Sequence, residues 1–130
     1  MSLFQECVDS LKKEVIVYAA AATLKIFEEF QQKNKFTFYG RIDWSTFQRS
    51  FKINNLDDIR KHIVHNEKCY ILWNDTSFPV LETSLQSVYM NVDNVLAVSY
   101  DTWLYVFEKN IVIEFYHDGE ITIGFIDSND

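Results

Sequence analysis

Two histidines and a carboxylate lie at helical spacing in the middle of the chain. His62 and His65 are three residues apart, and Asp58 precedes His62 by one helical turn. Side chains at this spacing share one face of a helix, and they are of types that bind zinc. Histidines at this spacing are also common on solvated helix surfaces, and no second pair of ligands follows them. A small metal-dependent hydrolase built on these three residues is therefore a minor alternative.

A second candidate, for acid–base chemistry, surrounds His117. His117 and Asp118 lie between Glu114 and Glu120. Acid–base catalysis requires a pocket around such groups, whereas the tip of a hairpin is usually solvated. The sequence contains no nucleophile elbow, phosphate-binding loop or dinucleotide-binding turn. We therefore expect a protein that is not an enzyme and that requires neither a cofactor nor a metal.

The two cysteines and one apolar run indicate where the protein resides. Cys7 and Cys69 are too few and too far apart for a disulfide framework or a four-ligand zinc site. The apolar run 15–24 is about half the ~20 residues that cross a bilayer. It also follows acidic residues rather than a basic leader. We expect a cytoplasmic protein with reduced thiols that does not bind membranes.

The charge of the chain is divided unevenly along its length. The 130 residues include 12 Lys and Arg and 19 Asp and Glu, for a net charge of −7. Residues 1–66 contain ten bases and eight acids, whereas residues 67–130 contain two bases and eleven acids. Nucleic acid is disfavoured as a ligand, because contacts to its phosphates need clustered lysine and arginine side chains. A basic protein partner is favoured, although acidic surfaces also serve simply to keep proteins soluble.

Hydrophobic periodicity predicts the elements that would position these groups. Apolar residues at spacings of three and four predict one long helix or two abutting helices over residues 3–33. The remaining predicted elements before the last third are a strand over 35–39, helices over 44–51 and 56–65, a strand over 68–73, and a helix that begins at Thr83 or Ser84 and ends at 91. The order of helices and strands is typical of the α+β class.

The last third of the chain predicts an antiparallel meander. Four β-rich runs cover 94–100, 102–108, 111–117 and 120–126. Lys109-Asn110 and Asp118-Gly119 join the last three runs, and Asp-Gly between apolar runs is a strong hairpin signal. We therefore predict a single domain over 1–130, in which N-terminal helices pack on a mainly antiparallel sheet that ends in a four-stranded meander.

Two-residue turns would divide the meander into two faces. The turn at 109–110 pairs Tyr105 with Glu114, and the turn at 118–119 pairs Glu114 with Ile123. Residues that pair in this way lie on the same face of the sheet. The aliphatic face, which we expect the N-terminal helix to cover, carries Leu104, Val106, Ile111, Ile113 and Phe115. The opposite face carries Trp103, Tyr105, Phe107, Glu114 and Tyr116, with Asp101 at one edge and Ile121, Ile123 and Phe125 on the last strand.

The aromatic face suggests a surface that binds another protein. Trp and Tyr dominate interface hot spots, and carboxylates beside them suit a basic partner. The predicted partner-binding residues are Asp101, Trp103, Tyr105, Glu114, Tyr116, Asp118 and Glu120. The alternative is that this face is a second core under the helices at 44–65 or 83–91, with Glu114 capped by a tyrosine hydroxyl or an arginine. A slip of one residue in either turn would exchange the faces.

Four segments of the C-terminal half carry a family resemblance. They are residues 70–75 (YILWND), 93–99 (DNVLAVS), 101–104 (DTWL) and 112–121 (VIEFYHDGEI). Over about residues 68–126 the chain resembles the small bacterial immunity proteins that neutralise toxin domains of contact-dependent growth inhibition and related polymorphic toxin systems. The resemblance implies a cognate toxin as the partner, and such toxins are often basic nucleases. It carries over no functional residue by position.

The resemblance and the charge pattern lead to one functional prediction. The chain is expected to bind its toxin and to occlude the toxin's active site or an exposed surface, as a monomer or a weak homodimer. Opposite electric fields would accelerate the encounter. The main alternative is an acidic adaptor module for another basic protein.

Overall fold

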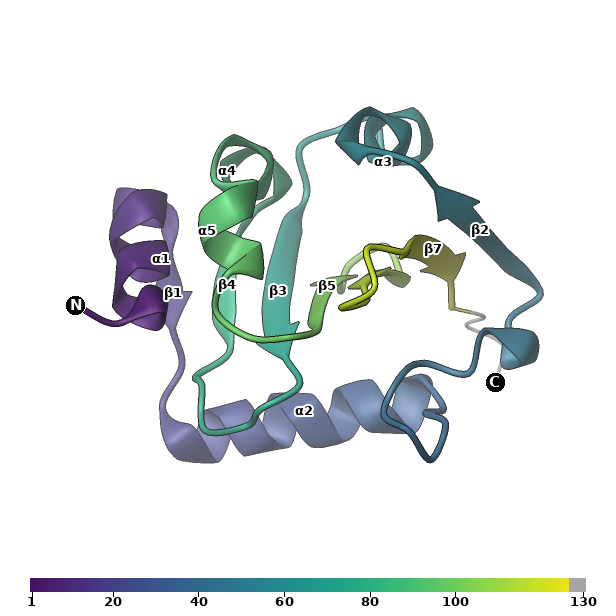
Figure 1. Ribbon diagram of the computed structural model, residues 1–130, viewed down its shortest axis with the longest axis horizontal. Helices are drawn as coiled ribbons and strands as arrows, with labels where there is room; N and C mark the ends of the chain where they lie inside the picture. The colour runs from purple at the N-terminus through teal and green to yellow at the C-terminus, as the bar shows by residue number, and fades with distance from the viewer. Residues whose placement is uncertain (127–130) are drawn as a thin grey trace.

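A seven-stranded antiparallel sheet organises the chain, and helices cover both of its faces (Figure 1). The computed structural model of the protein describes residues 1–126. The strands are β1 (Ile16–Val17), β2 (Arg49–Ile53), β3 (Lys68–Trp73), β4 (Leu81–Ser84), β5 (Thr102–Val106), β6 (Ile111–Phe115) and β7 (Ile121–Phe125), in the order β1-β4-β3-β5-β6-β7-β2. The helices are α1 (Leu3–Leu11), α2 (Ala20–Lys33), α3 (Leu56–His62), α4 (Leu85–Met90) and α5 (Val92–Leu96), with 3-10 turns η1 (Lys12–Glu14) and η2 (Trp44–Thr46). The predicted α+β class, with N-terminal helices and C-terminal strands, is confirmed. Within residues 1–126, none of the helices is both long and apolar enough to cross a membrane.

The N-terminal region forms two helices that lie on opposite faces of the sheet. Ser2 caps α1 by accepting a hydrogen bond from the Gln5 backbone N–H at 3.1 Å. Lys12 ends α1 with a positive φ of 60°, and β1 then pairs with β4 before α2 begins. The prediction of a continuous or abutting helix over residues 3–33 is therefore wrong, because a short strand separates the two helices.

The aliphatic face of the sheet carries the larger core. Helices α1, α3, α4 and α5 cover this face (Figure 1). The buried side chains that meet there include Cys7, Leu11, Ile59, Leu85, Val88 and Val95 from the helices, and Leu104, Val106, Ile111, Ile113 and Phe115 from the sheet. The predicted aliphatic face is confirmed, and α1 covers part of it as expected.

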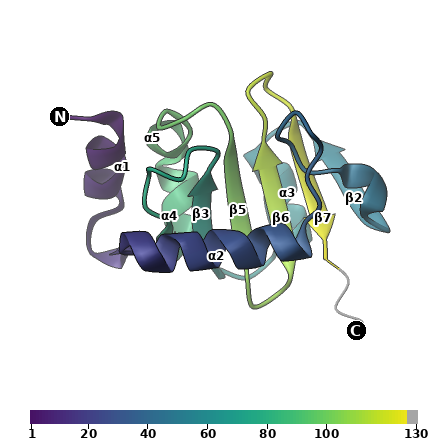
Figure 2. The ribbon, with the colours of Figure 1, turned by 90° about the horizontal axis from the view of Figure 1, so that it is seen from below.

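The opposite face is a second core and not a bare surface. Helix α2 lies across the strands on this side (Figure 2) and buries Phe27 and Phe30 against them. Trp103 and Tyr105 are buried in the same cluster. The prediction that these rings form a partner-binding face is wrong. The alternative of a second core is right. Helix α2 covers it, Trp44 and Phe47 from the predicted segment 44–65 also pack against it, and the segment at 83–91 lies on the other face.

The β6–β7 hairpin has a different register from the predicted one, which changes the face of β7. Phe115 pairs with Ile121 and Glu114 pairs with Thr122, which differs by one residue from the predicted register. The Gly119 N–H donates to the Tyr116 carbonyl at 2.9 Å, and Gly119 has a φ of 95°. This geometry belongs to a three-residue loop over 117–119, in which glycine supplies the positive φ. The slip places Ile121 and Ile123 on the aliphatic face.

The β5–β6 hairpin is also longer than predicted, without a change of face. Val106 pairs with Ile111 and Trp103 pairs with Glu114, so the loop covers 107–110 and Asn110 takes a positive φ of 54°. The observed register of β5 and β6 differs from the predicted register by two residues. Because side chains alternate with a period of two, each residue of β5 and β6 keeps its predicted face.

Three further element predictions are corrected by the structure. The run 94–100 is not a strand, because its first residues belong to α5, whose Val95 and the following Val98 are buried at a helical spacing. The meander therefore has three strands. The predicted helix over 44–51 is reduced to η2 followed by β2, which pairs with β7. The predicted strand over 35–39 is reduced to a single bridge between Phe36 and Ile42.

Other predicted elements are confirmed with adjusted ends. Strand β3 has the predicted bounds. Helix α3 begins after its Asn55 cap and ends at His62, three residues before the predicted end. Helix α4 begins after Ser84, whose hydroxyl accepts a hydrogen bond from the Ser87 N–H at 3.2 Å.

Gly124 provides a test of the packing between β7 and η2. A Cβ atom at this position would overlap the Trp44 ring and would lie 2.9 Å from the Phe47 ring. We expect Gly124→Ala to lower the free energy of unfolding by about 1–3 kcal/mol, because rings must move to admit the methyl group. Urea denaturation measures this change. An unchanged midpoint would contradict the packing described for Trp44 and Phe47.

Candidate partner-binding surface

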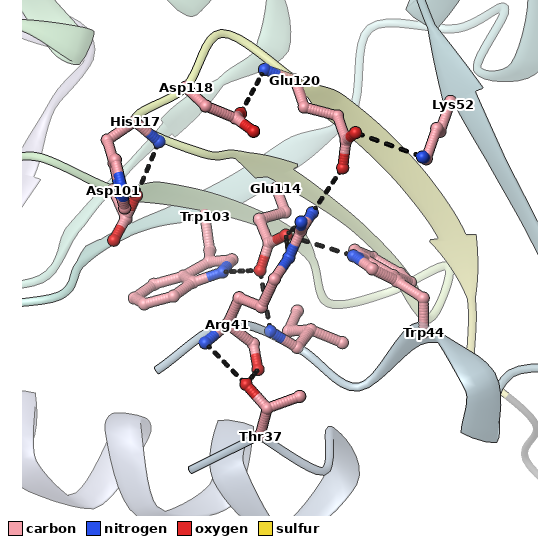
Figure 3. Close-up of polar contacts among 11 residues, drawn as sticks. Thr37, Arg41, Trp44, Lys52, Asp101, Trp103, Glu114, His117, Asp118 and Glu120 are labelled. Carbon is pink, nitrogen blue, oxygen red and sulfur yellow. Dashed lines mark hydrogen bonds and ion pairs between the residues drawn. The ribbon is translucent and has the colours of Figure 1, made fainter. Parts of the chain in front are cut away.

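A buried carboxylate joins the sheet to the loop that follows α2. Glu114 is 0% exposed and accepts hydrogen bonds from both Nε (3.1 Å) and Nη2 (2.8 Å) of Arg41. It also accepts from the Ile42 N–H at 2.8 Å and from the indole N–H groups of Trp44 and Trp103, each at 3.1 Å. All five donors converge on one side chain (Figure 3). The buried charge is therefore fully compensated, and Glu114 has a structural role.

Arg41 extends this network to the surface. Its Nη2 also contacts Glu120 at 2.8 Å, and Lys52 contacts the other oxygen of Glu120 at 3.2 Å. These hydrogen bonds, the one from Arg41 first, hold the pKa of Glu120 below its ordinary value. The guanidinium lies 4.3 Å from the centre of the Tyr116 ring. Loop 34–43 is thus fixed against the β6–β7 hairpin by charge as well as by packing.

Four loops meet at the same end of the sheet. Trp73 pairs with Thr102, and Thr102 pairs with Phe115, so the loops 74–80, 97–101 and 116–120 lie side by side. The Arg41 network adds loop 34–43, which stands beside the hairpin at the upper end of the strands in Figure 2. We define the sheet-end surface as Phe38, Tyr39, Tyr100, Asp101, Tyr116, His117 and Asp118.

The sheet-end surface exposes large aromatic side chains. Phe38 is 100% exposed, Tyr39 58% and Tyr100 82%. The His117 ring lies between Tyr116, at 4.1 Å between ring centroids, and Tyr100, at 6.4 Å. Exposed rings that cluster in this way are typical of a protein-binding site and not of an ordinary solvated surface.

Acidic groups accompany these rings. The four loops contain five acids and two bases, for a net charge of −3. Asp118 is exposed at the hairpin tip, and its carboxylate accepts a hydrogen bond from the Glu120 N–H at 2.8 Å. Burial, followed by the charge of Asp101, raises the pKa of Tyr116. The surface therefore combines apolar contact area with negative potential.

Comparison with known proteins gives the family. A family model described as "CdiI immunity protein EcoliA0-like" matches residues 1–124 of the chain. The chain belongs to this family. The sequence resemblance covered only the C-terminal half, whereas the family match also includes α1, α2 and α3. No curated protein matches the chain.

A CdiI immunity protein binds and neutralises a cognate toxin protein, so the predicted partner is confirmed at this level. The structure places four of the seven predicted binding residues in the interior and three at the surface. Trp103, Tyr105 and Glu114 lie inside the fold, and Asp101 is buried at its edge. The remaining three, which reach the surface at the same end of the sheet, are Tyr116, Asp118 and Glu120.

Sequence reasoning missed the most exposed rings of this CdiI immunity protein. Phe38 and Tyr39 had been assigned to a strand, and Tyr100 to the end of another. A signal for the first pair exists, since two aromatic residues directly precede Gly40, which turns the chain with a φ of 94°. Tyr100 has no comparable local signal.

The residues considered for metal chemistry do not form a metal site. His62 stacks on Phe51 with ring centroids 5.2 Å apart, while Asp58 accepts from the Asn54 N–H at 3.0 Å. Within residues 1–126, no group of three or more His, Cys, Asp or Glu side chains is placed to hold a metal ion. Asp58 and His62 thus have local structural contacts in place of shared ligation, and His65 is exposed.

Both cysteines of the CdiI immunity protein are free and buried. Burial raises the pKa of the Cys7 thiol to about 11. Burial, and then the charge of Glu82, raises the pKa of Cys69 to about 12. The thiolate is the reactive form, so neither side chain is suited to act as a nucleophile near neutral pH.

Proposed function

We propose that this CdiI immunity protein neutralises its toxin by covering it with the sheet-end surface, without catalysis. The observation that carries the proposal is the exposure of Phe38, Tyr39 and Tyr100 beside Asp118. Large rings with few rotatable bonds supply binding energy at the centre of an interface. Exposing them to water in the free protein is unfavourable, and a partner that buries them removes this cost.

The charge of the surface favours a basic toxin. The four loops at the sheet end carry a net charge of −3, and residues 67–130 contain eleven acids and two bases. A nuclease-type toxin presents lysine and arginine side chains where the phosphates of the nucleic acid bind. Carboxylates of the immunity protein would take the positions of those phosphates and block the active site. We propose that this binding occurs in the cytoplasm, with the immunity protein as a monomer or weak homodimer that does not itself bind nucleic acid.

The fold supplies a rigid base for such a contact. Tight inhibitor interfaces bury about 800 Å² on each partner. The sheet-end surface draws on three loops that are joined by the Arg41 and Glu114 hydrogen bonds and by strand pairing. Because these loops are held in place, little conformational entropy is lost when the toxin binds.

Co-purification with the toxin domain encoded beside this chain tests the proposal. We expect a complex at low salt and protection of growth when both proteins are expressed. The association rate constant should fall about 10-fold or more when ionic strength rises from about 0.05 M to 0.5 M, because salt screens the opposite charges. A toxin that forms no complex and is not neutralised in cells would refute the proposal. A salt-independent association rate would refute its electrostatic part.

A further inference from the structure

Asp101 has a carboxylate oxygen that the fold leaves without a partner. The residue is 8% exposed, and its Oδ1 accepts from the His117 N–H at 2.8 Å. The His117 Nδ1 lies 3.0 Å from the same oxygen. No hydrogen bond joins Oδ2 to any of residues 1–126. Oδ2 is not among the fully buried unpaired atoms of the described residues, so it is open to a donor from outside the fold.

Two adjoining hollows give access to this carboxylate. One has a volume of about 360 Å³ and is lined by Asn74, Tyr100, Asp101 and His117. The other has a volume of about 380 Å³, shares Asn74 and Asp101, and extends to Phe38. Hollows that hold small ligands have volumes of about 300–1,000 Å³. Asp101 therefore lies where the two hollows meet, with an aromatic side chain beyond it on each side.

The residues that line the two hollows favour a planar, positively charged group. A carboxylate and the π-faces of aromatic rings both attract positive charge. The basic side chains nearest in the network are already engaged, because Arg41 binds Glu114 and Glu120 and Lys52 binds Glu120. A guanidinium can stack on Tyr100 while its N–H groups reach Oδ2, whereas the ammonium of lysine cannot match this planar geometry.

We propose that the hollow between Tyr100 and Asp101 receives one arginine side chain of the toxin. This inference rests on the proposed function and specifies a contact within that surface. His117 holds Asp101 in place from the hairpin, and Asn74 fixes its backbone by accepting from the Asp101 N–H at 3.0 Å. The acceptor is thus oriented before the toxin arrives, which favours affinity.

Two variants test this contact through the dissociation constant of the toxin complex. Asp101→Asn keeps an acceptor for the His117 N–H but removes the charge that faces the arginine. We expect about 10–100-fold weaker binding, as is typical when a buried charged hydrogen bond is lost. Tyr100→Ala removes an exposed ring without touching the core, and we expect about 10-fold weaker binding. Asp93→Asn, an exposed acid outside the surface, is the matched control and should bind like the wild type.

A double-mutant cycle identifies the arginine itself. Each interface arginine of the toxin is replaced by lysine and measured against wild type and Asp101→Asn. One arginine replacement should weaken toxin binding to the wild-type immunity protein. The same replacement should cause little further loss of affinity for Asp101→Asn.

If the wild-type complex forms but Asp101→Asn and Tyr100→Ala both bind within 2-fold of it, the arginine site is refuted and the proposed function stands. If the wild type does not bind the toxin, the proposed function fails first, and the arginine site fails with it. Thermal unfolding shows whether Asp101→Asn is folded, and Tyr100→Ala decides the outcome if it is not.

Discussion

Replacing Glu114 by alanine is expected to lower the free energy of unfolding by about 3–5 kcal/mol. The side chain is 0% exposed and accepts five hydrogen bonds, from Arg41, Ile42, Trp44 and Trp103. Its removal leaves the Arg41 Nε–H, the Ile42 N–H and two indole N–H groups without their acceptor, while Arg41 keeps only its contact with Glu120. A loss of this size removes a large part of the stability of a small domain. Urea denaturation followed by fluorescence of the tryptophans measures it directly.

Glu28→Ala is the matched control for this prediction. Glu28 lies on the exposed side of α2, so its replacement should change the free energy of unfolding by no more than about 0.5 kcal/mol. Equal stabilities of the two variants would contradict the role assigned to Glu114. The result also separates stability from binding, since Glu114→Ala would lose toxin protection by unfolding and not by the loss of a surface contact.

The parts of the fold that sequence reasoning predicted are those set by local chemistry. Ser2, Asn55 and Ser84 cap helices because their side chains bond to the next turn, and such signals act within four residues. The aliphatic face of β5 and β6 was also predictable. It depends only on the alternation of apolar residues, which a two-residue change of register preserves.

The predictions that were wrong concern features that depend on contacts between segments far apart in the sequence. Glu114 lies 73 residues from Arg41, and no local pattern indicates that this arginine compensates its charge. Strand β2 forms on the edge of the sheet because β7 is available for pairing, although the sequence predicts a helix over 44–51. The face of β7 depended on whether the hairpin loop has two or three residues, and Asp-Gly is compatible with both.

The candidate site was predicted in part for the same reason. Tyr116 and Asp118 of the proposed surface are among the residues that the sequence predicts, because they belong to one hairpin. Phe38, Tyr39 and Tyr100 come from two other loops, and only the sheet brings those loops to the hairpin. The interpretation that rings and carboxylates bind a basic partner is retained for the sheet end, although it was wrong for the buried face.

The second large effect is expected from truncating the sheet-end surface itself. The triple variant Phe38→Ala, Tyr39→Ala and Asp118→Asn removes two exposed rings and one exposed charge. Asn keeps an acceptor for the hairpin N–H that Asp118 binds. Because interface aromatic residues commonly contribute about 2 kcal/mol or more each, we expect at least about 100-fold weaker binding of the toxin. The fold should be unaffected, since Phe38 and Tyr39 lie outside both cores.

A triple variant elsewhere on the surface provides the comparison. Val64→Ala, Met90→Ala and Glu108→Gln also remove two exposed apolar side chains and one hairpin acid. Isothermal titration of the cognate toxin domain into each variant, at one fixed salt concentration, measures both dissociation constants. We expect a loss of at least about 100-fold for the sheet-end variant and less than about 3-fold for the comparison variant. Equal losses, or a larger loss in the comparison variant, would show that the toxin binds another part of the protein.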